Sequence, residues 1–248
     1  MYVWKCWRDS RSRFIISVIA LLALCVLFSY MEVRFAFGAI GAGPPSSVSQ
    51  VWSHATAFVL GGVASLLILL WGLVMGASGP GEEFEKRTAD FLLVRPRRRS
   101  YWVWTGWSVG VLELSAMAFV AAATTFGTLT YRLGHVQTWW PLATAVPLAL
   151  GGVVAYGLTY FMTIVARNGK QGLSYGFGIF FIDLLLPVAV SYYYPNVNLP
   201  SVLGFMVGAC KWVASTSRAF PTGSLVLWTA IALAFPFAAQ LLLERAEV

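Results

Sequence analysis

The chain alternates six long apolar runs with short polar segments that hold most of its charges. An α-helix rises 1.5 Å per residue, so about 20 apolar residues cross the hydrocarbon core of a bilayer. Each run predicts a membrane-spanning helix, and together they predict an all-α, polytopic transmembrane helix bundle forming a single domain over residues 1–248. The predicted spans are Phe14–Met31, Ala55–Ala77, Tyr101–Thr130, Trp139–Ala166, Leu173–Tyr192 and Leu225–Leu243.

The segment before the first span is basic and carries aromatic residues at near-helical spacing. Trp4, Trp7 and Phe14 recur on one side, whereas charged residues such as Lys5 occupy other faces. A basic helix with tryptophans lies at the headgroup level of a membrane. Residues 1–13 are therefore predicted to form an interfacial helix, and a solvated basic segment that only orients the chain is the alternative.

A shorter apolar segment, residues 199–213, precedes the last span and is interrupted by Gly204 and Gly208. Its length of about 15 residues favours a re-entrant or interfacial element on the outer side of the membrane over a span. If this segment did cross the membrane, the carboxyl terminus would lie outside.

The composition excludes a water-soluble globular protein. Only 11% of the residues are charged and 58% are hydrophobic, with a mean hydropathy of +0.73, whereas soluble domains carry about 25% charged residues. With the amino terminus in the cytoplasm, the outer segments hold only Arg34, Arg132, Lys211 and Arg218 of the 17 Lys and Arg residues. The positive-inside rule then predicts a multi-pass protein of the bacterial inner (cytoplasmic) membrane with both termini cytoplasmic. The net charge of +7 needs no nucleic-acid partner.

The cytoplasmic segment between the second and third spans has a distinct charge pattern. A Gly-Pro-Gly motif predicts the end of the preceding span. Acidic residues follow and basic residues come after them, which is the order that a helix dipole favours. Glu82 and Lys86, and likewise Glu83 and Arg87, form i,i+4 pairs. The pattern predicts a short amphipathic helix over residues 82–96, ended by a proline.

One face of this predicted helix is largely apolar and includes Phe84, Thr88, Phe91 and Leu92. A rigid helix between two spans can insert into a groove on a soluble partner and pass the motion of that partner into the membrane. It can equally be an ordinary amphipathic helix that caps the bundle. Periodicity alone leaves both interpretations open.

The same segment resembles the coupling helix of type-2 ABC exporter permeases, although Phe84 replaces a more polar residue of that family. The Trp-Lys-x-x-Trp-Arg-Asp-Ser start is similar to the amino-terminal elbow helix of the family, and the six spans and the short apolar element before the last span also fit. The positions that match the coupling motif are Glu83, Glu85, Arg87, Thr88, Asp90, Leu92, Leu93 and Pro96.

The resemblance implies a permease subunit that moves substrate by alternating access and is not itself an enzyme. Its partners would be an ABC nucleotide-binding subunit, a second identical or similar permease, and membrane lipid. The chain lacks a Gly-x-x-x-x-Gly-Lys-Ser/Thr phosphate loop, so ATP and Mg are expected on the partner subunit and no cofactor on this chain. The residues implied to couple to the ATPase are Glu82, Glu83, Phe84, Glu85, Arg87, Thr88, Phe91 and Leu92.

Two carboxylates, Glu113 and Asp183, fall well inside predicted spans. Charged groups in a bilayer are costly enough that a functional role is the first hypothesis, here the lining of a translocation pathway or a proton relay. The alternative is a carboxyl group that is protonated or bonded to a neighbouring helix, for which Ser115 or nearby threonines could serve.

Two other classes of function compete with the permease. An ion-driven carrier or a non-enzymatic membrane scaffold would show the same hydropathy, although carriers commonly contain internal repeats. An intramembrane enzyme needs a nucleophile–base pair or clustered metal ligands. The three cysteines and two histidines form no such pattern, so no catalytic or metal-binding residue is predicted.

Overall fold

The computed structural model describes residues 2–38, 48–85, 96–134, 140–194, 199–214 and 222–245. These residues are almost entirely helical and include no strand, which confirms the predicted all-α fold. Six helical segments within this part of the chain are long and apolar enough to cross a membrane, so the chain is a multi-pass membrane protein. The elements are α1 (Tyr2–Gly38), α2 (Val48–Phe58), the π-helix η2 (Val59–Ala64), α3 (Ser65–Glu85), α5 (Pro96–Leu133), α6 (Trp140–Ala143), α7 (Ala145–Ala166), α8 (Gly169–Tyr193), α9 (Val202–Ala214) and α10 (Thr222–Arg245).

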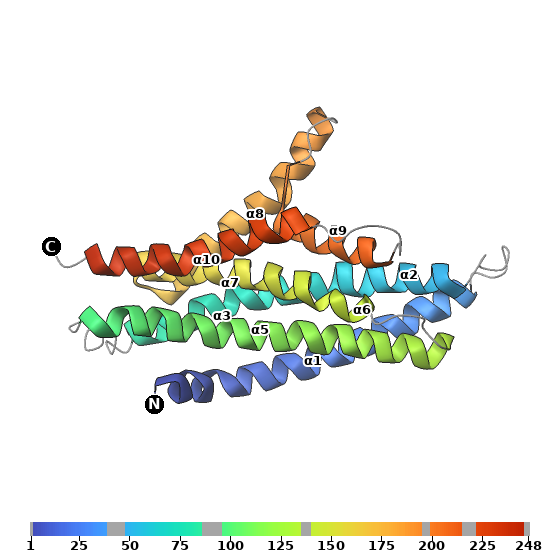
Figure 1. Cartoon of the computed structure of the whole chain (residues 1–248), viewed down its shortest axis with the longest axis horizontal. Helices are drawn as coiled ribbons and strands as arrows, with labels where there is room; N and C mark the ends of the chain where they lie inside the picture. The colour runs from blue at the N-terminus through green and yellow to red at the C-terminus, as the bar shows by residue number, and fades with distance from the viewer. Residues whose placement is uncertain are drawn as a thin grey trace.

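Most helices run along the long axis of the molecule, and α7 lies among them, packed against α3, α5, α8, α9 and α10. The start of α1, the end of α3, the start of α5, the turn between α7 and α8, and the end of α10 gather at one end of the bundle (Figure 1). We call this end the basic end, because the segments predicted to be cytoplasmic meet there. The second half of α8 leaves the bundle (Figure 1).

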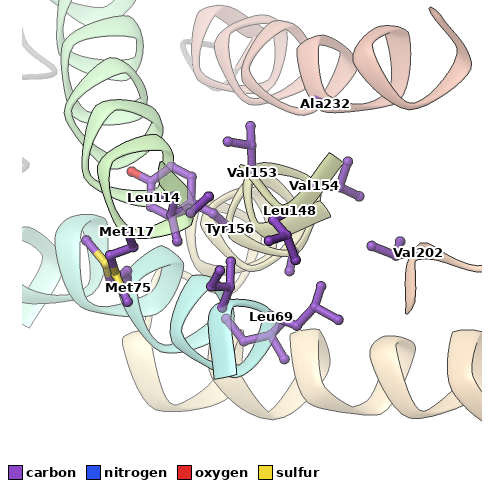
Figure 2. Close-up of a cluster of buried hydrophobic side chains, with 14 of the residues drawn as sticks. Leu69, Met75, Leu114, Met117, Leu148, Val153, Val154, Tyr156, Val202 and Ala232 are labelled. Carbon is purple, nitrogen blue, oxygen red and sulfur yellow. The ribbon is translucent and has the colours of Figure 1, made fainter. Parts of the chain in front are cut away.

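The core surrounds α7. Figure 2 shows side chains of α7 meeting those of α3, α5, α9 and α10. Since lipid tails are as apolar as these side chains, shape complementarity rather than the hydrophobic effect holds such helices together. The labelled core residues are Leu69, Met75, Leu114, Met117, Leu148, Val153, Val154, Tyr156, Val202 and Ala232.

Glycines allow α3 to approach the backbone of α7 and α8. A Cβ atom on Gly72 would lie 2.6 Å from the carbonyl oxygen of Gly152, and one on Gly76 would overlap the carbonyl oxygen of Tyr156. At the basic end, a Cβ atom on Gly81 would lie 2.7 Å from the Cα atom of Gly169. The contact between α3 and its neighbours is therefore a backbone contact that a side chain would separate.

The structure corrects the predicted end of the second span. Helix α3 continues through Gly79, Pro80 and Gly81 to Glu85. The contact of Gly81 with α8 holds this last turn in place, and membrane helices tolerate an internal proline when neighbouring groups support the backbone. The acidic residues at 82, 83 and 85 consequently lie in the last turn of α3 and do not begin a separate helix.

Pro96 was predicted to end the amphipathic helix, but it is the first residue of α5. The first residue of a helix has no intrahelical partner for its N–H group, so a proline fits there at little cost. The rest of the predicted coupling segment, including Arg87, Thr88, Phe91 and Leu92, lies outside the described residues.

Three other elements differ from their predicted bounds. Helix α1 runs unbroken from Tyr2, so the predicted interfacial helix of residues 1–13 is continuous with the first span; no glycine or proline interrupts it before Gly38. The predicted span Trp139–Ala166 divides at Thr144 into α6 and α7. The short apolar element is α9, whose 13 residues reach about 20 Å, and it packs against α2, η2 and α7.

We predict that Gly72→Ala weakens the bundle, because the new methyl group forces α3 away from Gly152. Overpacking of this kind costs about 1–3 kcal/mol, which lowers the thermal midpoint of the purified protein in detergent. Gly127→Ala on α5 is the control, since its Cβ atom meets nothing within 4 Å and alanine favours a helix. Equal midpoints for the two variants would contradict the close contact.

Candidate functional site

A polar cavity of about 120 Å³ lies among α1, α3, α5 and α7. It brings together charged and hydroxyl side chains that are far apart in the sequence, inside an otherwise apolar bundle. Because it includes the start of α1 and the end of α3, it lies toward the basic end. Its polar lining residues include Lys5, Ser10, Arg13, Ser78, Glu83, Glu113, Tyr156 and Tyr160.

An ion pair joins the first turns of α1 to the last turn of α3. The Nζ atom of Lys5 donates a hydrogen bond to Oε1 of Glu83 over 2.5 Å. Glu83 is only 8% exposed, and its carboxylate lies at the negative end of the α3 dipole. A buried charge in such a position needs a counterion, so the lysine of α1 stabilises the last turn of α3.

Glu113 of α5 is the second carboxylate of the cavity and is only 2% exposed. The Ser10 hydroxyl lies within hydrogen-bonding distance of its Oε1 atom and also lies 3.1 Å from the carbonyl oxygen of Cys6. The Oε2 atom has no hydrogen-bond partner among the described residues. Ser10 begins the candidate span of α1, so Glu113 lies level with that end of the span. The hydrogen-bond partner is thus Ser10 of the neighbouring helix α1, which agrees with the structural alternative for Glu113, and not Ser115.

Two tyrosines of α7 dock onto α5 and form another wall of the cavity. The Tyr156 hydroxyl donates to the carbonyl oxygen of Gly106 over 2.9 Å, and the Tyr160 hydroxyl donates to that of Val103 over 3.2 Å. Figure 2 shows Tyr156 extending to α5. A Cβ atom on Gly110 would overlap the Tyr156 ring. The sequence contained a signal for this contact that was not used. Gly106 and Gly110 are four residues apart on one span, and Tyr156 and Tyr160 are four residues apart on another.

The structure places the predicted coupling residues only in part. Glu83 lies in the cavity, the Phe84 ring meets the Trp102 ring edge-on at 6.1 Å between centroids, and Glu85 is exposed at the end of α3. Glu82 lies in the same helical turn. Glu83 and Phe84 thus anchor the end of α3 to α1 and α5.

A comparison with known families matches residues 14–241 to a family described as "Protein of unknown function (DUF2705)". The chain belongs to the DUF2705 family. The matched range contains Glu83, Glu113 and both tyrosines of the cavity, whereas Lys5, Ser10 and Arg13 precede it. A comparison with curated proteins found no match. The family description gives no function, so the polar cavity of this DUF2705 protein and the segments around it are the remaining guide to its function.

Asp183, the other carboxylate predicted to lie inside a span, is half-buried on α8 and is not part of the cavity. Its Oδ2 atom accepts a hydrogen bond from the backbone N–H of Val202 over 3.0 Å. The Ser201 hydroxyl oxygen accepts one from Gly204, also over 3.0 Å. The first N–H groups of a helix lack intrahelical partners, so these two side chains cap α9, and Asp183 also ties it to α8.

We predict that Lys5 and Glu83 are energetically coupled. Lys5→Ala leaves a nearly buried carboxylate without its cation and should lower stability by about 1–3 kcal/mol. Glu83→Gln should lower it less, and the double variant should be little worse than Lys5→Ala alone. A double-mutant cycle on thermal unfolding in detergent measures this coupling. Lys170→Ala, at an exposed lysine, is the control, and additive effects would contradict a direct interaction.

We predict that Asp183 acts as a helix cap. Asp183→Ala removes the acceptor and should cost about 0.5–2 kcal/mol, whereas Asp183→Asn keeps an acceptor oxygen and should change little. The loosening of α9 can be followed through Cys210, which is fully buried in that helix, in a chain whose Cys6 and Cys25 are replaced by serine and alanine. A thiol reagent should modify Cys210 several-fold faster in the alanine variant only. Equal rates in the two variants would exclude the cap.

Proposed function

We propose that this protein is the membrane-spanning permease subunit of an ABC exporter of the bacterial inner membrane, with both termini in the cytoplasm. The observation that carries the proposal is the segment from Glu82 to Arg99, whose sequence resembles a coupling helix. The last turn of α3 and the first turn of α5, which this segment includes, lie at the basic end of the bundle (Figure 1). The positive-inside rule favours the cytoplasmic side for that end.

The contacts at the end of α3 support a mechanical role for this segment. A force applied between α3 and α5 would reach the last turn of α3, which is bonded to α1 through Lys5 and Glu83. The same turn packs against α8 through Gly81 and Gly169. Motion at this point would therefore reach α1 and α8 as well as the two helices that flank the segment. The polar cavity lies beside these contacts and would change shape with them.

In this proposal the chain contributes no catalytic residue. A separate nucleotide-binding subunit would bind ATP and Mg, and hydrolysis there would switch the membrane cavity between inward and outward access. Alternating access of this kind needs two membrane halves, so the permease would pair with a second identical or similar chain. Membrane lipid surrounds the assembly, and no nucleic acid takes part.

The proposal is tested by co-purification from the native host in mild detergent, with stoichiometric partners identified by mass spectrometry. The expected partner is a soluble ATPase at one copy per chain. A variant that combines Glu85→Lys with Arg87→Glu should lose this partner, because it reverses charges in the coupling segment without touching the buried Glu83. The control combines Glu244→Lys with Arg245→Glu at the exposed end of α10 and should retain the ATPase.

If the wild-type chain purifies from the native host without any ATPase, the permease proposal is overturned. The second candidate would then be an ion-driven carrier, which one observation favours: the buried carboxylate of Glu113 is of the kind that carriers use to bind coupling ions or protons. Such a carrier would move its substrate in proteoliposomes that contain this chain alone and an imposed ion gradient. The scaffold hypothesis predicts no movement.

A further inference from the structure

A second pocket, of about 370 Å³, lies between α1 and α5 and shares Val109 and Glu113 with the polar cavity. We call it the Glu113 pocket. Leu112 is 70% exposed and Ala116 is also exposed, so the pocket opens onto the surface that the two helices present to lipid. Its lining residues are Trp7, Phe14, Val109, Leu112, Glu113 and Ala116.

Glu113 is the only charged side chain among the described residues that line this pocket. The residue is only 2% exposed to solvent. One carboxylate oxygen is bonded to Ser10, and the Oε2 atom has no partner among the described residues. Buried polar atoms are almost always satisfied, so an unpaired carboxyl oxygen on a side chain that lines a pocket is a candidate partner for a ligand.

Glu113 also lines the polar cavity, which holds two basic side chains. Lys5 and Arg13 line that cavity and do not line the Glu113 pocket. Lys5 is bonded to Glu83, and Arg13 attracts Glu113 electrostatically. In the Glu113 pocket, by contrast, the carboxyl group of Glu113 is surrounded by apolar lining residues alone.

The lining selects a chemical class. Apolar walls with one carboxylate favour a ligand that is mostly apolar and carries one positive charge. The Trp7 and Phe14 rings, whose centroids are 5.6 Å apart, can add cation–π attraction. A hydrated inorganic cation would find too few oxygen ligands here to replace its water, and an anion would be repelled.

We propose that the Glu113 pocket binds a hydrophobic organic cation that enters from the lipid, with its charge facing Oε2 of Glu113. That such a cation is the exported substrate rests on the proposed function. That the pocket binds it does not. Because Ser10 and Lys5 lie on the same helix, a ligand that displaces Glu113 from Ser10 would also move α1 at its contact with α3.

The test is equilibrium binding of tetraphenylphosphonium to the full chain, purified in detergent without any ATPase. Tetraphenylborate, an anion of the same shape, controls for hydrophobic partitioning. The wild type is expected to bind the phosphonium at least ten times more tightly than the borate. Glu113→Gln should abolish this preference by weakening phosphonium binding at least ten-fold, whereas Asp183→Asn, the same chemical change at the half-buried carboxylate of α8, should leave it intact.

A second variant keeps the test decisive if Glu113→Gln fails to fold. Ala116→Phe fills the pocket from its exposed side and should weaken phosphonium binding at least ten-fold, while Ala230→Phe at an exposed position of α10 should not. Wild-type protein that binds neither ion, or both equally, would overturn the inference, and so would unchanged binding in Ala116→Phe. If the chain binds phosphonium but no ATPase co-purifies with it from the native host, the site is retained and the exporter is not. If an ATPase co-purifies but the chain does not bind phosphonium, the exporter is retained and the site is not.

Discussion

Lipid provides no hydrophobic force between helices, so the bundle depends on how closely α3 approaches α7 and α8. Gly72 and Gly76 allow backbone contact with α7, and Gly81 allows it with α8. That contact supports the helix beyond Pro80. The extra turn then carries Glu83 to Lys5 of α1. The ion pair, the cavity beside it and the position of the coupling segment all follow from this approach.

Helix α1 is held to the rest of the bundle in an unusual way. Much of its candidate span is exposed, and near the basic end its polar contacts reach α3 through Lys5 and Glu83 and α5 through Ser10 and Glu113. Polar bonds in a low-dielectric setting are strong when both partners are present and costly when one is lost. The position of this end of α1 is therefore sensitive to the charge and occupancy of the two carboxylates.

The sequence predicted what depends on local composition and missed what depends on contacts across the bundle. Span positions follow from hydropathy, and the two carboxylates inside the spans were recognised because charge is rare in such segments. The continuation of α3 through Gly79–Gly81 was not predicted, because a Gly-Pro-Gly motif ends a helix unless a neighbouring helix supports it. Ser10 could not be assigned to Glu113 across 103 positions. Nor does spacing alone show that Asp183 faces the start of α9.

The two carboxylates inside the predicted spans differ in a way that separates structure from function: Glu113 is buried and Asp183 is half-buried. The position of Asp183 is explained by a structural role, because the first N–H group of α9 needs an acceptor and the aspartate supplies it. Glu113 also makes one bond, to Ser10, but a neutral glutamine would serve that bond as well. The Oε2 atom of Glu113 has no partner among the described residues, and an unpaired polar atom in a buried position costs free energy. The pocket that opens past Leu112 and Ala116 gives a ligand from the membrane a route to the Glu113 side chain, and a bond to that ligand would remove this cost.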